Sequence, residues 1–373
     1  MTINVLHVYK TCSPYTQGGI EEVIHQICRA TSQLGLNNRI VCISNQCKKK
    51  EIIETPEAVI YCYPMSFEVA SCGFSWALWK EFKHLSKWAD VIHYQFPWPF
   101  ADILALTRQG NSTPYIVSYQ SDIIRQQGLN KLYQPLMNTF LDSAAAVVAT
   151  SPKYIISSAV LSQLKQTVEL IPNGIDTEPN PVAYQQERAE YYQLYGTTFF
   201  LFIGVFRYYK GLSYLLEAAK KTKLPIVIAG EGPESSELHR YVQENQLENV
   251  HFLGHVNDEQ KYALIDLTTA LILPSSERSE AYGMVLVEAA RQTTAMISTE
   301  LGSGTSYINA HNETGLVVSA KNAEELADAM LTLTKDSDKV TTMSLAAKQR
   351  FEANFTADMM GKRYTELYHS VIA

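Results

Sequence analysis

Two glutamates separated by seven residues stand where an apolar run gives way to a polar loop and then to a helical pattern. Glu280 lies in the loop and Glu288 in the pattern 285–292, which repeats apolar residues at helical spacing. In a continuous helix the two carboxylates would lie about 12 Å apart along the axis, whereas a paired acid and base acting on one bond need roughly 5–9.5 Å. The spacing therefore favours two contacts along one extended ligand, with two solvated side chains as the plain alternative.

The elements around these glutamates place them at an edge of a sheet. The apolar run 271–273 ends at Pro274, which predicts a buried strand, and the loop then leads into the helix. In a parallel sheet such a junction lies at the carboxyl ends of the strands, where ligands bind. The N–H groups at the start of the helix favour an anion there.

Two cations follow another predicted strand. Arg207 and Lys210 lie in the loop after the apolar run 199–204. An arginine can bind two oxygens at once and a lysine acts as a point charge, so the pair suits a diphosphate. Two ordinary surface cations are the alternative.

A pair of glycines lies between the strand and the helix of the first strand–loop–helix unit. Gly18 and Gly19 follow the strand 4–8 and precede a helical pattern from Ile20. Glycines at this position leave room for a ligand near a helix start, although a simple turn would also explain them. The pattern G-x-G-x-x-G is absent, which argues against a dehydrogenase.

Strands alternate with helices along the chain, which predicts parallel, doubly wound sheets. The expected strands span residues 4–8, 39–44, 59–63, 91–94, 115–122, 144–150, 168–171, 199–204, 225–230, 249–254, 271–273 and 295–299. The turn 172–176, followed by Pro179 and Pro181, predicts a polar, helix-poor connector between two domains.

The composition narrows the class of protein. A chain of 373 residues with 46% hydrophobic and 18% charged residues suits two folded domains. No apolar run reaches the roughly 18 residues of a membrane span, and no signal peptide is recognisable, so we expect a cytoplasmic protein. Six cysteines without a C-x-x-C pair predict neither a disulfide framework nor a metal site. The net charge of −7 argues against nucleic acid as a partner.

The predicted helix 75–88 interleaves tryptophans with lysines. This combination is typical of helices at a membrane surface, and an ordinary amphipathic helix on the sheet is the alternative. A contact between the N-terminal domain and the inner face of the plasma membrane is therefore a hypothesis.

Together these segments resemble the family-four retaining glycosyltransferases, and within them the bacterial O-antigen mannosyltransferases. The resemblance lies in the E-x7-E spacing, in Lys210-Gly211, in Gly230-Glu231-Gly232-Pro233 and in the blocks GGIEEVIHQIC and SYQSDI. It implies the GT-B fold, in which two Rossmann-like domains face each other across a cleft. It also implies that the last helix, 355–372, crosses back to the first domain. The domains would then be residues 1–172 with 355–373, for the acceptor, and 173–354, for the donor nucleotide sugar.

The resemblance also implies roles for individual residues. Glu280 would bind hydroxyls of the donor sugar, Glu288 those of the ribose, and the two cations the leaving diphosphate. Further donor-binding positions would be Gly18, Gly19, Gly204, Glu231, Gly232, Tyr282, Gly283, Met284 and Val285. Gln120 stands where the family usually has a histidine, and Gln95 replaces the second histidine of an HxH pattern. A glutamine can position a hydroxyl but cannot titrate.

The implied reaction is the transfer of a hexose, in the first place mannose from GDP-mannose, to a hydroxyl of a lipid-linked glycan. Neither a cofactor nor a metal is expected, and the segment 336–338, DSD, is interpreted as a helix cap. A rhamnosyl- or glucosyltransferase using a UDP- or TDP-sugar is the alternative within the class. A non-catalytic protein that binds nucleotide sugars is the alternative outside it.

Overall fold

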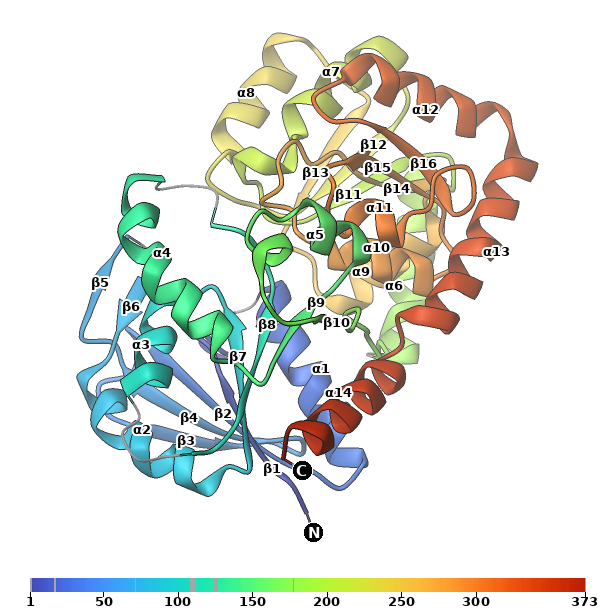
Figure 1. Cartoon of the computed structure of the whole chain (residues 1–373). Helices are drawn as coiled ribbons and strands as arrows, with labels where there is room; N and C mark the ends of the chain where they lie inside the picture. The colour runs from blue at the N-terminus through green and yellow to red at the C-terminus, as the bar shows by residue number, and fades with distance from the viewer. Residues whose placement is uncertain are drawn as a thin grey trace. The chain divides into compact units, whose positions relative to one another are not determined.

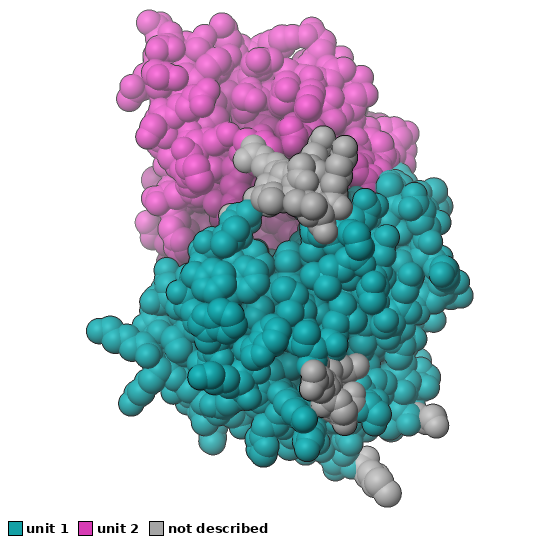
Figure 2. Space-filling model, turned by 60° about the vertical axis from the view of Figure 1, so that its left-hand side comes forward, with its two compact units in different colours: residues 1–176, 356–373 teal, residues 177–355 magenta. Residues whose placement is uncertain are grey.

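The computed structural model describes residues 2–16, 18–70, 72–107, 112–123, 127–176 and 178–372. The chain forms two compact units, Met1–Asp176 with Thr356–Ala373 and Thr177–Phe355 (Figure 2). Each unit contains a parallel sheet with helices packed against it (Figure 1). Unit 1 ends its first segment four residues beyond the sequence-based boundary at residue 172.

Unit 1 is built on an eight-stranded sheet in the order β10-β9-β8-β7-β1-β2-β4-β3. All described neighbours are parallel except the edge pair β3–β4. The strands are β1 Asn4–Val8, β2 Asn37–Ser44, β3 Glu51–Glu54, β4 Val59–Pro64, β7 Val91–Phe96, β8 Tyr115–Tyr119, β9 Ala146–Ala149 and β10 Val168–Leu170. Every residue of β7, β8 and β9 is buried, as expected for strands covered on both faces.

The helices of unit 1 follow its strands in the alternation that the sequence predicts. They are α1 Gly19–Gln33, α2 Trp76–Trp88, α3 Pro99–Thr107, α4 Gln127–Asp142, α5 Pro152–Ser157 and α14 Ala357–Ile372, with a short 3-10 turn at Leu161–Gln163. A small hairpin, β5 Phe67–Val69 and β6 Cys72–Phe74, precedes α2. All six cysteines are free thiols in this unit.

The C-terminal helix α14 packs on α1, as the family resemblance implies (Figure 1). The two helices approach closely at Gly361, where an added Cβ would lie 2.5 Å from the Cβ of Ala30. Tyr364 and Tyr368 of α14 are fully buried. The last helix is therefore part of the core of unit 1, although unit 2 separates it from the rest of that unit in the sequence.

Unit 2 contains a six-stranded sheet in the order β13-β12-β11-β14-β15-β16, parallel throughout. Its strands are β11 Phe200–Ile203, β12 Ile226–Ala229, β13 Val250–Gly254, β14 Ala270–Leu273, β15 Met296–Glu300 and β16 Gly315–Ser319. Its helices are α6 Pro181–Tyr195, α7 Leu212–Thr222, α8 Ser235–Glu244, α9 Asp258–Leu267, α10 Met284–Arg291, α11 Thr305–Ile308, α12 Ala323–Lys335 and α13 Ser337–Asn354, with a 3-10 turn at Tyr208–Lys210. Counted along the chain, the strand order is 3-2-1-4-5-6, the doubly wound arrangement of Rossmann folds.

The predicted helix-poor connector is wrong, because the fifteen-residue helix α6 begins at Pro181. Proline is tolerated at the first position of a helix, where its missing N–H has no partner to lose. The side chain of Asn180 accepts hydrogen bonds from the N–H groups of Val182 and Ala183, which caps the helix. The prolines that suggested a connector therefore mark the start of a helix.

The segment DSD caps a helix, as predicted. The side chain of Asp336 accepts a hydrogen bond from the N–H of Lys339 at the start of α13.

None of the helices in the described part of the chain is long and apolar enough to cross a membrane.

Candidate functional site

The strand order of unit 2 reverses between β11 and β14, which are neighbours in the sheet although two strands separate them in the sequence. In doubly wound sheets, ligands bind beside the carboxyl ends of the strands at this reversal. The loop after β11 contains Arg207 and Lys210, and the loop after β14 contains Glu280. The fold thus brings the predicted cations and the first predicted carboxylate to one edge.

Lys210 and Glu280 form an ion pair in which Nζ lies 2.5 Å from Oε2. Ser275, fully buried, also donates a hydrogen bond to Oε2, at 3.0 Å. Burial alone would lower the pKa of Lys210, but the neighbouring carboxylate and Tyr209 raise it overall. Lys210 is therefore a permanent cation, and Glu280 is fixed from two sides. Sequence reasoning missed Ser275, which precedes Glu280 by five residues in a run of polar residues.

The two loops are joined by backbone contacts that need a glycine. Gly211 has a φ of +70°, and a Cβ there would lie 2.0 Å from the carbonyl oxygen of Pro274. The N–H of Ser276 donates to the carbonyl of Tyr209 at 2.7 Å. Because only glycine fits this approach, the motif Lys210-Gly211 sets the distance between the cation and the loop of Glu280.

Arg207 differs from Lys210 in its surroundings. Its side chain is exposed, and no described residue forms an ion pair with it. Val205 and Arg207 are both exposed while Phe206 between them is buried, so the backbone directs these side chains alternately outward and inward. The guanidinium is therefore available to an anion at this edge.

The loop after β12 packs directly on the loop after β11. A Cβ on Gly230 would lie 2.1 Å from the carbonyl oxygen of Gly204, and one on Gly232 would lie 2.5 Å from that of Phe206. The N–H of Phe206 also donates to the carbonyl of Glu231 at 2.9 Å. These glycines thus permit two backbone segments to touch, which places Glu231 beside the first loop.

Helix α10 begins at the edge of the site. Gly283, with a φ of +87°, precedes its first residues, Met284 and Val285. The first N–H groups of a helix have no acceptor within the helix, so they remain available at this end. Tyr282 is buried and lies against Gly304 of the next loop, where a Cβ would come within 2.5 Å of the tyrosine ring.

Glu288, the second predicted carboxylate, lies in α10 and pairs with Lys261 of α9 at 2.8 Å. Lys261 also pairs with Asp258, at 2.8 Å. Burial alone would lower the pKa of Lys261, but Glu288, Tyr262 and Asp258 together raise that pKa overall. Glu280 and Glu288 thus have separate cationic partners. The sequence did not indicate Lys261, since 27 residues separate it from its partner.

In unit 1, Gly18 ends the loop between β1 and α1 and Gly19 is the first residue of α1, and both are exposed. Gly18 has extended backbone, and a Cβ there would approach the carboxylate of Glu21 within 2.6 Å. Glu21 accepts hydrogen bonds from the hydroxyls of Thr11, at 2.8 Å, and Thr16, at 3.0 Å. The first turn of α1 therefore anchors both sides of this loop.

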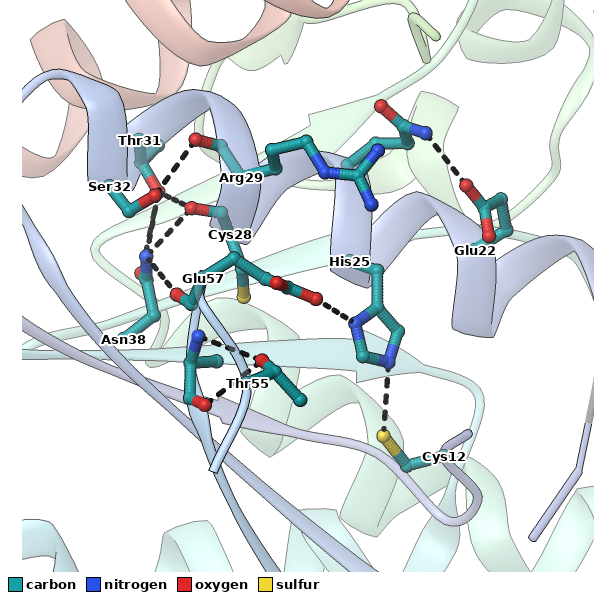
Figure 3. A network of polar contacts seen from close by, with 12 residues as sticks. Cys12, Glu22, His25, Cys28, Arg29, Thr31, Ser32, Asn38, Thr55 and Glu57 are labelled. Atoms are coloured by element: carbon teal, nitrogen blue, oxygen red, sulfur yellow. Dashed lines mark hydrogen bonds and ion pairs between the residues drawn. The ribbon is translucent and has the colours of Figure 1, made fainter. Parts of the chain in front are cut away.

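A second network of polar contacts, which includes Cys12, also holds this loop (Figure 3). His25 of α1 lies between Cys12, with Nε2 3.5 Å from Sγ, and Glu57, with Nδ1 2.9 Å from Oε1. A hydrogen bond with Cys42 and the nearby His25 lower the pKa of the Cys12 thiol, against the effect of burial. Burial lowers the pKa of His25, but Cys12 and Glu57 raise it overall.

Gln120 follows β8 in unit 1 and is buried, and its Nε2 donates to Oε1 of Gln95 at 2.8 Å. His93 is fully buried and hydrogen-bonded, so it is a core residue rather than an exposed ligand-binding side chain. Among the described residues, no group of three or more His, Cys, Asp or Glu side chains is arranged to hold a metal ion.

The fold is similar to those of solved glycosyltransferases. Sucrose-phosphate synthase from Thermosynechococcus elongatus superposes with a TM-score of 0.80 at 19% identity, covering 99% of both chains. HepE from Anabaena, solved in complex with UDP-glucose, gives a TM-score of 0.77 at 15% identity, covering 99% of this chain and 100% of that one. Two parallel α/β units with a C-terminal helix packed on the first unit define the GT-B class.

Sequence comparison identifies the family. The family model of group 1 glycosyl transferases matches residues 185–350, and that of glycosyltransferase family 4 matches residues 17–179. D-rhamnosyltransferase WbpZ of Pseudomonas aeruginosa is 42% identical, covering 95% of this chain and 93% of its own. O-antigen chain mannosyltransferase C of Escherichia coli is 40% identical, covering 99% of both. The chain therefore belongs to the group 1, family 4 glycosyltransferases.

Proposed function

We propose that this glycosyltransferase transfers a hexose to a hydroxyl of a lipid-linked glycan during O-antigen synthesis, with retention of configuration. The hexose that we propose is mannose, and its donor is GDP-mannose. The observation that most supports a donor site is the ion pair between Lys210 and Glu280 at the reversal of strand order in unit 2. The relative with 40% identity is named as an O-antigen mannosyltransferase, which favours this sugar and pathway.

Charge arrangement suggests how the donor would be held. Lys210 has one of its three N–H donors on Glu280, so two remain for phosphate oxygens, and Arg207 adds an exposed guanidinium. Both cations would balance the negative charge that grows on the leaving diphosphate, a contribution made mainly in the transition state. Cations and the start of α10 would thus replace a metal in binding the diphosphate.

The carboxylates would orient the sugar nucleotide. Glu288, fixed by Lys261, would accept hydrogen bonds from ribose hydroxyls, and Glu280 from hydroxyls of the donor sugar. We propose no covalent intermediate on the protein: the acceptor hydroxyl would attack on the face that the diphosphate leaves. A leaving phosphate oxygen would take the acceptor's proton, since Gln120 cannot.

Rhamnosyl transfer is the second candidate, because the relative with 42% identity is named as a D-rhamnosyltransferase. Glucosyl transfer from a UDP-sugar remains a further alternative. A protein that binds nucleotide sugars without turning them over is the alternative outside the enzyme class.

The test is transfer from a panel of nucleotide sugars, measured as release of nucleoside diphosphate in the presence of a lipid-linked acceptor. GDP-mannose should be turned over fastest. Glu280→Gln keeps the size of the side chain and removes its charge, and we expect roughly a 10²- to 10³-fold loss of kcat with nucleotide affinity largely kept.

The control is Asp266→Asn, which removes a carboxylate of unit 2 paired with the exposed Arg188. Transfer should be unchanged in this variant. Turnover of a rhamnosyl or glucosyl donor alone would replace the mannose assignment, and no turnover of any donor would favour the non-catalytic alternative. Full activity in Glu280→Gln would remove that residue from the site.

We further propose that unit 1 contacts the membrane surface through α2. Trp76 and Trp79 are 62% and 38% exposed, and the exposed Lys80, Lys83 and Lys87 follow on the same side of the helix. An apolar cavity of about 240 Å³ adjoins the two tryptophans. It is lined by Phe67, Phe74, Ser75, Trp76, Trp79, Phe100 and Ile103. Exposed aromatic rings beside lysines suit an anionic bilayer, which would place a cytoplasmic enzyme at the inner face of the plasma membrane.

A further inference from the structure

Four polar side chains form a buried block on one face of the sheet in unit 1. His93 and Gln95 belong to β7, and Ser118 and Gln120 lie in β8 and directly after it. Residues two apart on a strand share a face, and β7 and β8 are paired neighbours. The block therefore brings the predicted site residue Gln120 into one hydrogen-bonded group with three residues of the core.

In this block each carboxamide nitrogen donates to the next residue, from Gln120 to Gln95 and from Gln95 to His93. Nε2 of Gln120 donates to Oε1 of Gln95 at 2.8 Å, and Nε2 of Gln95 lies 3.2 Å from Nε2 of His93. A carboxamide nitrogen can only donate, so the histidine must accept at Nε2. His93 is then the tautomer with its proton on Nδ1.

Helix α14 accommodates that tautomer. The hydroxyl of Tyr368 lies 2.8 Å from Nδ1 of His93 and can accept its proton. On the other side, Ser118 lies 2.7 Å from Nε2, and the hydroxyl of Tyr364 lies 2.8 Å from Ser118. Burial lowers the pKa of His93 well below its ordinary value, so the ring is neutral and Nε2 can accept.

The direction of these hydrogen bonds decides which end of the Gln120 carboxamide remains for a ligand. One N–H of its carboxamide donates to Gln95, which turns the nitrogen toward that residue, and no residue in the described part of the chain donates to its carbonyl oxygen, Oε1. A free glutamine side chain could present either end of its amide to a ligand. Here the carbonyl oxygen is the end that remains.

We propose that Gln95 and His93 are positioning residues that turn the carboxamide of Gln120 so that its carbonyl oxygen accepts a hydrogen bond from a sugar hydroxyl. The proposal rests on the proposed function, because it takes the ligand to be a sugar substrate of the transferase. A histidine at position 120 could donate or accept, whereas this carboxamide offers a fixed acceptor and so selects a ligand with a hydroxyl at that point.

The test is a double-mutant cycle on the full chain, with Gln95→Met, Gln120→Met and the double variant, scored by kcat/KM for sugar transfer. If Gln95 acts through Gln120, its effect disappears once Gln120 is gone. We expect Gln95→Met to lose roughly 3- to 10-fold, the worth of one hydrogen bond, and the double variant to match Gln120→Met alone. Additive losses would overturn the proposal, because independent sites add.

A second variant separates positioning from structure. Gln95→Glu keeps an oxygen that accepts from Gln120, and His93 can satisfy the carboxylate by moving its proton to Nε2 while Tyr368 donates to Nδ1. We therefore expect Gln95→Glu to be more active than Gln95→Met. A purely structural role predicts the reverse order, since a buried carboxylate destabilises more than a methionine.

Tyr115→Phe is the matched control, since it removes a buried hydrogen bond to the carbonyl of Phe140 at the other end of β8. It should lower thermal stability without changing kcat/KM. An equal loss of activity in this control would overturn the proposal while leaving the transferase function intact. If the unaltered protein transfers no sugar, the proposed function fails, and this inference fails with it.

Discussion

At the scale of residues, the predicted carboxylates do not stand alone. Glu280 pairs with Lys210 and Glu288 pairs with Lys261, and all four side chains are mostly buried. Removing one partner of a buried pair leaves the other charge uncompensated, at a cost of about 3–5 kcal/mol. Variants at these positions will therefore lose stability as well as function, which is why their unfolding must be measured beside their activity.

Two buried histidines make unit 1 sensitive to acid. Complete burial lowers the pKa of His7 to about 4, and burial also lowers the pKa of His93 beside it well below its ordinary value. The unfolded chain binds a proton at about pH 6.5 that folded His7 does not bind until about pH 4, so stability is lost as the pH falls through this window. We expect His7 to account for roughly 2–3 kcal/mol of the unfolding free energy lost between pH 7.5 and 4.5.

The measurement is urea unfolding followed by tryptophan fluorescence at pH 7.5 and 4.5. All four tryptophans lie between residues 76 and 98, so the signal reports unit 1. His7→Phe keeps a ring that cannot titrate and should lose less stability between the two pH values than the unaltered protein. The same loss in both proteins would contradict the assignment.

At the scale of elements, hydrophobic pattern located most strands and helices. β1 and α2 were predicted within a residue of their ends, because a run of apolar residues or a helical repeat is a local property. The hairpin β5–β6 and the edge strand β16 were not predicted. Phe67–Val69 is only three residues long and is exposed throughout, so pairing with β6 rather than burial makes it a strand.

The exposed side of α2 predicts binding to lipid vesicles. Vesicles that contain anionic lipid should sediment the protein, and Trp76→Ala with Trp79→Ala should weaken this binding by at least tenfold, because the two rings would no longer enter the interface. The measurement is co-sedimentation with anionic and with neutral vesicles.

Ile156→Ala provides the matched control, since this residue of α5 in the same unit is 80% exposed and does not line the apolar cavity beside Trp76 and Trp79. Its binding should equal that of the unaltered protein. Equal binding by the tryptophan variant, or none by the unaltered protein, would exclude α2 as a membrane contact.

At the scale of the whole molecule, each unit has its own sheet and core, and the chain returns to unit 1 only through α14. Residues from both ends of the sequence therefore stabilise the same unit. Tyr368 and Tyr364 of α14 also orient the polar block around His93, so the last helix contributes to the surroundings of Gln120 as well as to stability.

The contact between α14 and α1 predicts a localised loss of stability. Gly361→Leu should destabilise unit 1 by about 1–3 kcal/mol or more, because the added side chain meets Ala30 in a packed interface. Urea unfolding by tryptophan fluorescence should shift, while thermal stabilisation by a nucleoside diphosphate, which we propose binds to unit 2, should remain.

Glu366→Leu is the control, since Glu366 lies on the exposed side of α14. An unchanged midpoint in Gly361→Leu, or an equal shift in Glu366→Leu, would show that close packing at Gly361 is unimportant.

The sequence by itself determined the βα alternation, the family and the residue types at the site, because these depend on local pattern and on motifs such as Lys210-Gly211. Only the tertiary structure decided which of those residues meet. Lys210 and Glu280 are 70 residues apart in the chain and touch because β11 and β14 are neighbours in the sheet. Likewise, the hydrogen bonds that begin at Gln120 end at Tyr368, on a helix 248 residues farther along. The burial of hydrophobic residues selects the strand order that creates such contacts. No local sequence pattern determines that strand order.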